Sequence, residues 1–228
     1  MTDRIPGETD EYRQQVQKSI SFLGQGIDYF TEVKATRLLG LAATHLGDTS
    51  QLKALDVGCG VGLTDKFLAG HFRELHGVDV DASSLKSAAE ANPDARYSLY
   101  DGRTLPYPDG AFDLVFAVNV LHHVKPSLWP GFVGEMRRVA RPGGMAAIFE
   151  HNPINPLTRL AVRRCEFDGD ATLLYHRRLR RLIAQSGMNP LDSAYVLFCP
   201  FRSRLLSRVE SRLGWLPLGA QHYAAGRK

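Results

Sequence analysis

The stretch Leu55-Asp56-Val57-Gly58-Cys59-Gly60-Val61-Gly62 is the part of the sequence that decides the fold. The apolar run 53–57 predicts a buried strand, and residues 63–69 have helical spacing. Glycine has no Cβ and tolerates positive φ, so the chain can turn sharply there while a ligand approaches its backbone. The stretch therefore predicts a strand, a ligand-binding glycine loop and a helix, with Cys59 as a small residue in the tight loop rather than a nucleophile.

Strand-like and helix-like segments continue to alternate after this loop. Apolar runs predict strands at 75–80, 96–100, 112–118 and 145–150, and helical spacing predicts helices at 83–91 and 129–139. The run 141–144, Arg-Pro-Gly-Gly, predicts the end of the second of these helices. The alternation indicates an α/β fold with a parallel sheet covered by helices on both faces. Such sheets bind ligands at the carboxyl ends of their strands, so we expect the loops there to converge on one cleft.

The two ends of the chain differ from this central pattern. We expect residues 1–45 to form a helical lid or cap, in which Tyr29, Phe30 and Lys34 either cover the cleft or are ordinary core and surface positions. Residues 46–228 then form the main domain, with substrate-side elements at 151–220. Within that domain the pattern predicts a helix in 151–164, a helix at 172–185, and strands at 194–199 and 221–227.

Charge is distributed unevenly along the chain. Residues 1–150 carry 15 Lys and Arg against 19 Asp and Glu, whereas residues 151–228 carry 13 against 5. Part of this surplus is the basic cluster 176–181, which could suit nucleic acid or phospholipid, although Arg177, Arg180 and Arg181 share one helix face and so favour a solvated surface. A second basic, helix-like segment contains Arg202, Arg204, Arg208 and Arg212. An acidic or phosphorylated substrate therefore stays possible.

The same composition bears on where the protein works. No segment approaches the roughly 20 apolar residues that a membrane-spanning helix requires. The three cysteines are few and scattered, and the first residues carry no apolar leader. We therefore expect a reduced, cytoplasmic protein without a metal-binding cysteine pair.

Acidic residues at the strand ends refine the meaning of the glycine loop. A dinucleotide fingerprint, GxGxxG, would place a third glycine at position 63, which is Leu63. Asp56 precedes the loop, where a carboxylate suits a ligand that carries an ammonium and would repel a pyrophosphate. Asp79 ends the second strand, where it can accept both hydroxyls of a ribose, and Asp101 with Gly102 follows the third strand, where an acceptor can meet an adenine amino group.

These motifs together resemble those of class I S-adenosylmethionine (SAM)-dependent methyltransferases. The resemblance covers about residues 50–150 and includes LDVGCGVG, GVDVD, LPYPDGAFDLVFAVNVLHHV and EMRRVARPGG; it is strongest to the branch that contains quinone-biosynthesis methylases. It implies a Rossmann-like, seven-stranded, mostly parallel sheet whose last strand is antiparallel. It also implies SAM as cofactor and S-adenosyl-L-homocysteine as product. The cofactor-binding residues expected on this basis are Asp56, Gly58, Cys59, Gly60, Asp79, Val80, Asp101, Gly102 and Asn119.

Candidate catalytic residues should follow the fourth and fifth strands. His122, next to His123, and His151, next to Glu150, could each supply a general base near neutral pH. The His-His pair recurs in the family with unrelated substrates, which suggests a structural role for it. Residues 151–156 depart from the family pattern, so His151 is the stronger candidate. We expect no metal ligand.

The methyl acceptor is left open by the sequence. We expect a small-molecule or lipid-linked acceptor with an oxygen, nitrogen or carbon nucleophile. Methylases of DNA bases carry an Asn/Asp-Pro-Pro-aromatic motif after the fourth strand, where this chain reads Asn119-Val120-Leu121-His122, so nucleic acid is disfavoured. Two other functions remain: a SAM-binding regulator or partner subunit without transferase activity, and a nicotinamide oxidoreductase, which Leu63 and Asp56 disfavour.

Overall fold

The computed structural model describes residues 9–198 and 212–228, with side chains from residue 14 onward, and contains one seven-stranded sheet. The strand order is β3-β2-β1-β4-β5-β7-β6; the pairs among β1 to β5 are parallel, and β7 is antiparallel to both of its neighbours. The strands are β1 (Lys53–Val57), β2 (Glu74–Asp79), β3 (Arg96–Leu99), β4 (Phe112–Val118), β5 (Ala140–His151), β6 (Asn189–Val196) and β7 (Gln221–Arg227). This confirms the predicted Rossmann-like sheet and its antiparallel last strand.

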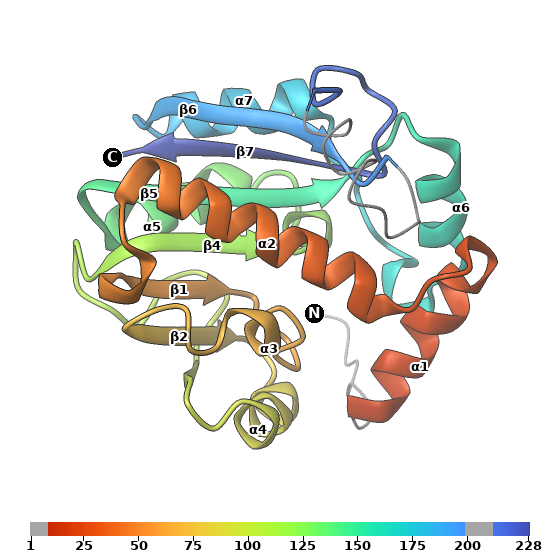
Figure 1. Cartoon of the computed structure of the whole chain (residues 1–228), viewed down its shortest axis with the longest axis horizontal. Helices are drawn as coiled ribbons and strands as arrows, with labels where there is room; N and C mark the ends of the chain where they lie inside the picture. The colour runs from red at the N-terminus through yellow and green to blue at the C-terminus, as the bar shows by residue number, and fades with distance from the viewer. Residues whose placement is uncertain (1–8, 199–211) are drawn as a thin grey trace.

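Helices cover both faces of the sheet, as Figure 1 shows. The α-helices are α1 (Thr9–Ile20), α2 (Ile27–Leu46), α3 (Asp65–Leu68), α4 (Ala82–Ala91), α5 (Trp129–Val139), α6 (Pro156–Arg164) and α7 (His176–Gln185). Short 3-10 turns are η1 (Ser21–Leu23), η2 (Thr49–Gln51), η3 (Leu121–His123) and η4 (Glu166–Asp168). Helix α2 crosses one face diagonally, α5 and α7 pack on the other face, and α1 and α6 lie beyond the carboxyl ends of the parallel strands.

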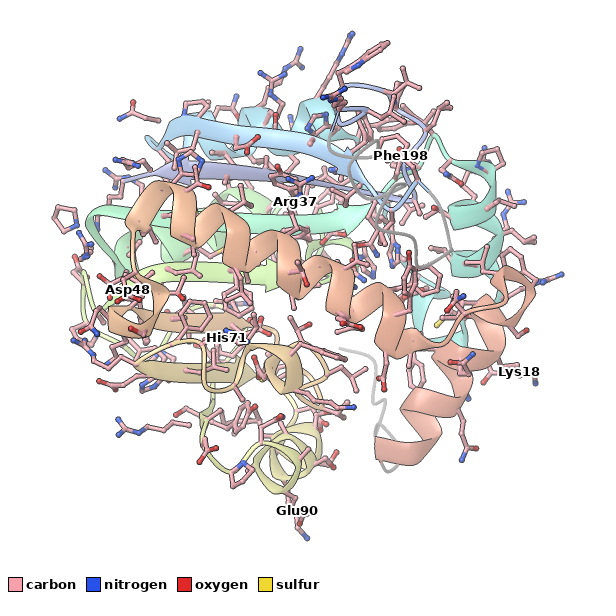
Figure 2. The ribbon with its side chains drawn as sticks, viewed as in Figure 1. Lys18, Arg37, Asp48, His71, Glu90 and Phe198 are labelled. Carbon is pink, nitrogen blue, oxygen red and sulfur yellow. The ribbon has the colours of Figure 1, made fainter. Side chains whose placement is uncertain are left out.

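The central strands are apolar on both sides because helices cover both faces. In β4, Leu114 and Phe116 join the core under α2, whereas Val115 and Ala117 join the core under α5 and α7. A parallel strand buried on both faces reads as a continuous apolar run, which is why this strand was recognisable in the sequence. Figure 2 shows Arg37 on α2, whose guanidinium lies 5.9 Å from the ring centre of Tyr223 on β7.

Three predicted starts of elements are wrong by four or five residues, each for a tertiary reason. Strand β5 begins at Ala140 rather than 145, because Ala140 pairs with Phe112 and the Gly143 N–H donates to the carbonyl of Lys228. Strand β6 begins at Asn189 rather than 194, because it pairs along the whole of β7. Helix α7 begins at His176 rather than Thr172, because the Thr172 N–H donates to the carbonyl of His122. The predicted strand end at Cys199 and the helix-like segment around Arg202, Arg204 and Arg208 lie outside the described residues.

The N-terminal segment is helical, as expected, but its two helices have different surroundings. The second half of α2 is part of the core, where Ala35, Leu38, Leu41 and Ala42 are buried against the sheet. Helix α1 instead packs on α2 and α6. Whether residues 1–45 act as a lid separate from 46–228 stays a prediction. Across the described parts of the chain, the structure has no helix that combines the length and apolar character of a membrane span.

Candidate functional site

A cavity of about 620 Å³ lies where the parallel strands end. Its floor is formed by the loops after β1, β2, β3 and β4, and its outer wall by α1, the start of α2, α6 and η4 (Figure 1). Ligand pockets commonly enclose about 300–1,000 Å³, so the cavity has the size of a binding site. Eight of the residues predicted to bind the cofactor or act in catalysis line it, namely Gly58, Cys59, Gly60, Asp79, Val80, Gly102, Asn119 and His151.

The glycine loop has the geometry that the sequence predicted. Gly58, Gly60 and Gly62 all have positive φ, at 80°, 53° and 72°. A Cβ built on Gly58 would lie 2.7 Å from Cγ1 of Val120, whereas one built on Gly60 would have no atom within 4 Å. Gly58 is therefore required by both backbone conformation and close packing, and Gly60 by its conformation. Burial raises the pKa of the Cys59 thiol well above its usual range, in keeping with a packed residue rather than a nucleophile.

Asp79 and Val80 form a second wall of the cavity. The Asp79 carboxylate accepts hydrogen bonds from the backbone N–H groups of Gly60, at 2.8 Å, and of Asp81, at 3.1 Å. These bonds hold the carboxylate at the cavity surface, although burial raises its pKa. Val80 is 60% exposed in the cavity wall, and a Cβ on Gly102 would lie 3.2 Å from its Cγ1. The loop at Gly102 thus lies close to the apolar side chain of Val80, the residue that follows Asp79.

Two predicted cofactor residues do not line the cavity. Asp56 is buried beneath the loop, where burial, followed by the nearby carboxylates of Asp65 and Asp79, raises its pKa well above the usual range. Asp101 is exposed, and its carboxylate accepts hydrogen bonds from the backbone N–H groups of Arg103 and Thr104 at 2.8 and 2.7 Å. Direct contact of Asp56 with an ammonium and of Asp101 with an adenine therefore stays a prediction.

Asn119 carries a strained backbone at the cavity surface. Its φ is 59°, which is uncommon for a residue other than glycine and often marks a functional position. Its N–H donates to the carbonyl of Phe149 at 2.9 Å, and its buried Oδ1 finds no hydrogen-bond donor within the described chain. A hydrogen-bond acceptor without a partner fits a ligand that brings its own N–H or O–H donor.

His122 is occupied by a buried ion pair. Its Nδ1 lies 2.7 Å from Oε2 of Glu150, whose other oxygen accepts the N–H groups of Val120 and Leu121. Its Nε2 lies 3.5 Å from Oδ1 of Asp168. Burial alone would lower the pKa of His122, but the Glu150 and Asp168 carboxylates raise it to about 9. The ring is buried and absent from the cavity lining, so a role of His122 as general base stays a prediction.

His151 differs from His122 in reaching the cavity. Burial, together with the positive charge of His122, lowers the pKa of His151 to about 3, so its imidazole is neutral at physiological pH. Its Nδ1 lies 3.4 Å from Nε2 of Gln221. His123 also lines the cavity and is partly exposed. Of the two histidines proposed as bases, only His151 is placed to touch a ligand.

Sequence reasoning missed most of the outer wall of the cavity. Lys34 was considered only as a possible lid residue, yet its buried side chain lines the cavity, and burial lowers its pKa to about 8. Thr31, one helical turn before Lys34, also lines the cavity, as does Gln221. The helical spacing of Thr31 and Lys34 is the only signal that could have found them, and it is a weak one.

One cluster of donor atoms bears on the expectation of no metal. Single ligand atoms of His122, His123 and Asp168 all lie within 4.8 Å of one another, close enough to hold an ion together. Asp168 Oδ1 lies 3.5 Å from Nε2 of both His122 and His123, and these ion-pair contacts account for the arrangement without a metal. The expectation of no metal therefore stays untested.

The cavity fits SAM in three respects. It offers positive-φ glycines that allow close backbone approach, a ribose-binding type of carboxylate at Asp79, and an unsatisfied polar oxygen on Asn119. Its described lining residues include no arginine, and the Asp79 carboxylate at its surface would repel a pyrophosphate. When bound, SAM would supply an electrophilic methyl group.

The comparisons with known proteins agree with this geometry. The model of a methyltransferase domain family matches residues 55–148. The 2-methyl-6-phytyl-1,4-hydroquinone methyltransferase of Synechocystis sp. is 32% identical over 43% of this chain and 31% of its own length. The malonyl-[acyl-carrier protein] O-methyltransferase of Pectobacterium atrosepticum is 32% identical over 61% of this chain and 54% of its own length. The chain thus spans about a third to about half of these relatives.

The fold is shared over nearly the whole chain. The crystal structure of a SAM-dependent methyltransferase from Thermotoga maritima, a possible histamine N-methyltransferase, covers 96% of this chain, which covers 95% of it, with a TM-score of 0.67. Its identity is 18%, so this likeness concerns the fold alone. Residues 55–148 thus match a methyltransferase domain, within a fold of the class I SAM-dependent type whose cofactor is SAM.

Proposed function

We propose that this protein transfers the methyl group of SAM to an oxygen, nitrogen or carbon atom of a small-molecule or lipid-linked acceptor. The observation that supports the proposal is the shared cavity: the glycine loop, Asp79 and His151 all line it. Methyl transfer from a sulfonium is an in-line displacement, in which the protein aligns the nucleophile and excludes water. A site that places cofactor-binding groups and a neutral imidazole in one cavity suits that task.

His151 is the residue we propose to position the acceptor. A neutral imidazole can accept a hydrogen bond from a hydroxyl or amine and orient its lone pair toward the methyl group. Its low pKa makes it a weak base, so we expect it to contribute more by orientation than by full proton abstraction. Lys34 offers an ammonium in the same cavity and can hold an oxygen of the cofactor or the acceptor.

The outer wall favours an acceptor with an apolar body. Val16 and Ile20 of α1, Leu23 of η1, Phe30 of α2 and Ala161 of α6 line this side. Apolar surface contributes about 25 cal/mol for each Å² removed from water, so an alkyl or aromatic body would gain affinity here. The Synechocystis relative, by its name, acts on a phytyl hydroquinone, which has such a body.

The test is SAM turnover in the presence of candidate acceptors. The acceptors of the two curated relatives and a series of 4-alkylphenols are incubated with SAM, and S-adenosyl-L-homocysteine is measured by mass spectrometry. We expect product with at least one acceptor, and for His151→Ala a kcat about 10- to 100-fold lower with an unchanged Kd for SAM. His71→Ala, at an exposed position away from the cavity lining, serves as the control with unchanged kcat.

The alternative function is that of a SAM-binding regulator or partner subunit without transferase activity. Tight SAM binding without product from any acceptor would favour it over the proposal. The contiguity of cofactor and acceptor surfaces in one cavity speaks for the enzyme, since a regulator has no need for a second binding surface beside the methyl group.

A further inference from the structure

The surface next to α6 exposes more large apolar side chains than its surroundings. Trp215 is 75% exposed, Leu218 59%, Leu157 52% and Ile154 47%. Single exposed apolar residues are ordinary, but a contiguous group of them marks an interaction site. We refer to residues 154–164 and 212–218 together as the α6 face.

Hydrogen bonds hold the two segments of the α6 face together. The Asn155 side chain donates to the carbonyl of Leu218 at 2.7 Å, and the Asn152 side chain donates to the carbonyls of Pro217 at 3.0 Å and Gly219 at 2.7 Å. Thr158 Oγ1 donates to the carbonyl of Ala220 at 2.8 Å. The loop at Leu218 is therefore fastened to the start of α6, and Trp215 lies three residues before Leu218 in the same segment.

The charge of the α6 face has one sign. Arg159, Arg163, Arg164 and Arg212 are exposed, and the segments 151–164 and 212–220 contain no Asp or Glu. Three acidic residues follow α6: Glu166 accepts a hydrogen bond from Gln15, Asp168 faces His122 and His123, and Asp170 lines the cavity. The exposed leucines of α6 thus stand among arginines.

The α6 face is continuous with the mouth of the cavity. Leu157 belongs to both, because it lines the cavity and is also half exposed to solvent. On the next turn of α6, Ala161 lines the cavity beside Val16 and Ile20 of α1. Figure 1 shows α6 and the loop before β7 at the same end of the molecule as the carboxyl ends of the parallel strands.

We propose that the α6 face docks on an anionic lipid bilayer and places the cavity mouth at the lipid surface. Tryptophan and leucine side chains inserted among headgroups, with arginines that contact lipid phosphates, form the pattern by which proteins lie on a membrane without spanning it. An acidic protein partner would also match arginines and an exposed tryptophan, but the bilayer in addition accounts for the apolar surface that continues through Leu157 into the cavity. An apolar acceptor could then enter the cavity from the bilayer without crossing water.

Vesicle binding tests this proposal independently of catalysis. The full-length protein is sedimented with vesicles of phosphatidylcholine alone and of phosphatidylcholine mixed with phosphatidylglycerol. We expect binding to the anionic vesicles that weakens as salt is raised. Arg159→Glu with Arg163→Glu should weaken binding to them about tenfold or more, and Trp215→Ser with Leu218→Ser about tenfold.

Matched controls change the same chemistry elsewhere on the surface. Arg73→Glu with Lys86→Glu makes the same change in net charge at exposed sites outside the α6 face, and Leu99→Ser removes an exposed apolar side chain from β3, at the opposite edge of the sheet. Both controls should bind anionic vesicles like the unchanged protein. Because the α6-face substitutions are at exposed positions, thermal unfolding should confirm that those variants fold.

Three results would overturn the proposal. They are absence of binding to anionic vesicles, equal loss of binding in the controls and the α6-face variants, and a dimer in solution that Trp215→Ser dissociates. Since none of these measurements involves methyl transfer, their outcome is separate from that of the proposed activity.

Discussion

The two halves of the cavity are built by different means. The cofactor half, made of the glycine loop, Asp79 and the loop at Gly102, is shaped by backbone conformation and by carboxylates that accept backbone N–H groups. The acceptor half, made of α1, the start of α2, α6 and η4, is shaped by side chains on helices. Backbone constraints permit few residue types at each position, whereas a helical wall accepts many apolar residues. The half that we propose to bind the cofactor therefore leaves a motif in the sequence, whereas the half that we propose to bind the acceptor leaves none.

Glu150 connects the two halves of the cavity. It lies at the end of β5, is fully buried, binds the loop after β4 and pairs with His122, which in turn faces Asp168 of η4. Glu150, through His122, thus connects the loop after β4 to η4 on the other side of the cavity. Four predictions test, in turn, the contacts of Glu150, the cofactor half, the charge on His122 and the surface outside both halves.

The largest effect is expected for Glu150→Ala. Loss of the carboxylate leaves Nδ1 of the buried His122 ring and the N–H groups of Val120 and Leu121 without their acceptor, so the free energy of unfolding should fall by about 3–5 kcal/mol. Urea denaturation measures this, with Glu90→Ala as a control because Glu90 is exposed on α4 (Figure 2). A loss under about 1 kcal/mol would mean that Glu150 does not join the halves.

The next effect is expected for Gly58→Ala, which tests the cofactor half alone. A positive φ costs a residue with Cβ about 1–2 kcal/mol, and overlap with Val120 adds about 1–3 kcal/mol. Stability and SAM affinity, measured by denaturation and calorimetry, should both fall. Gly40→Ala on α2, with open space around its Cβ, should instead raise stability by about 0.5–1 kcal/mol. Equal behaviour of the two variants would contradict a packing requirement at Gly58.

The charge on His122 predicts a pH dependence. Its folded-state pKa of about 9 lies above the usual 6.5, so its stabilising contribution is fully present below pH 6.5 and is lost as the pH rises through 9. The stability difference between the protein and His122→Asn should therefore shrink by on the order of 2 kcal/mol across that window. Comparison with the variant removes the opposite contribution of Lys34, whose folded pKa is lowered to about 8. A pH-independent difference would show that His122 is neutral in the folded protein.

The smallest effect is expected for Arg177→Ala with Arg181→Ala. Both side chains lie on the exposed face of α7, opposite the buried Leu179 and Leu182, and neither lines the cavity. Each substitution should change the free energy of unfolding by less than about 0.5 kcal/mol, with no change in SAM affinity. A marked loss of SAM affinity would mean that the basic face of α7 reaches the cofactor after all.

The strands and the loop were predictable because their signals are local. The continuous apolar run of β4 and the glycines of the loop follow from burial on both faces and from positive φ, and neither depends on distant residues. The errors at β5, β6 and α7 all came from partners far along the chain, such as the carbonyl of Lys228 for Gly143 and that of His122 for Thr172. Such partners leave no periodic pattern near the segment they alter.

The sequence by itself determined the α/β fold, the position of the cofactor loop after the first strand, and the glycines of that loop. It could do so because backbone conformation limits the residue types that the loop accepts. Only the tertiary structure decided which acidic and histidine side chains face the cavity. It placed Asp79 and His151 at the cavity surface, buried Asp56 and His122, and left Asp101 in solvent. It also joined Pro217 and Leu218 to the segment at the start of α6, since this contact rests on side-chain hydrogen bonds of Asn152 and Asn155 to backbone carbonyls distant in the chain.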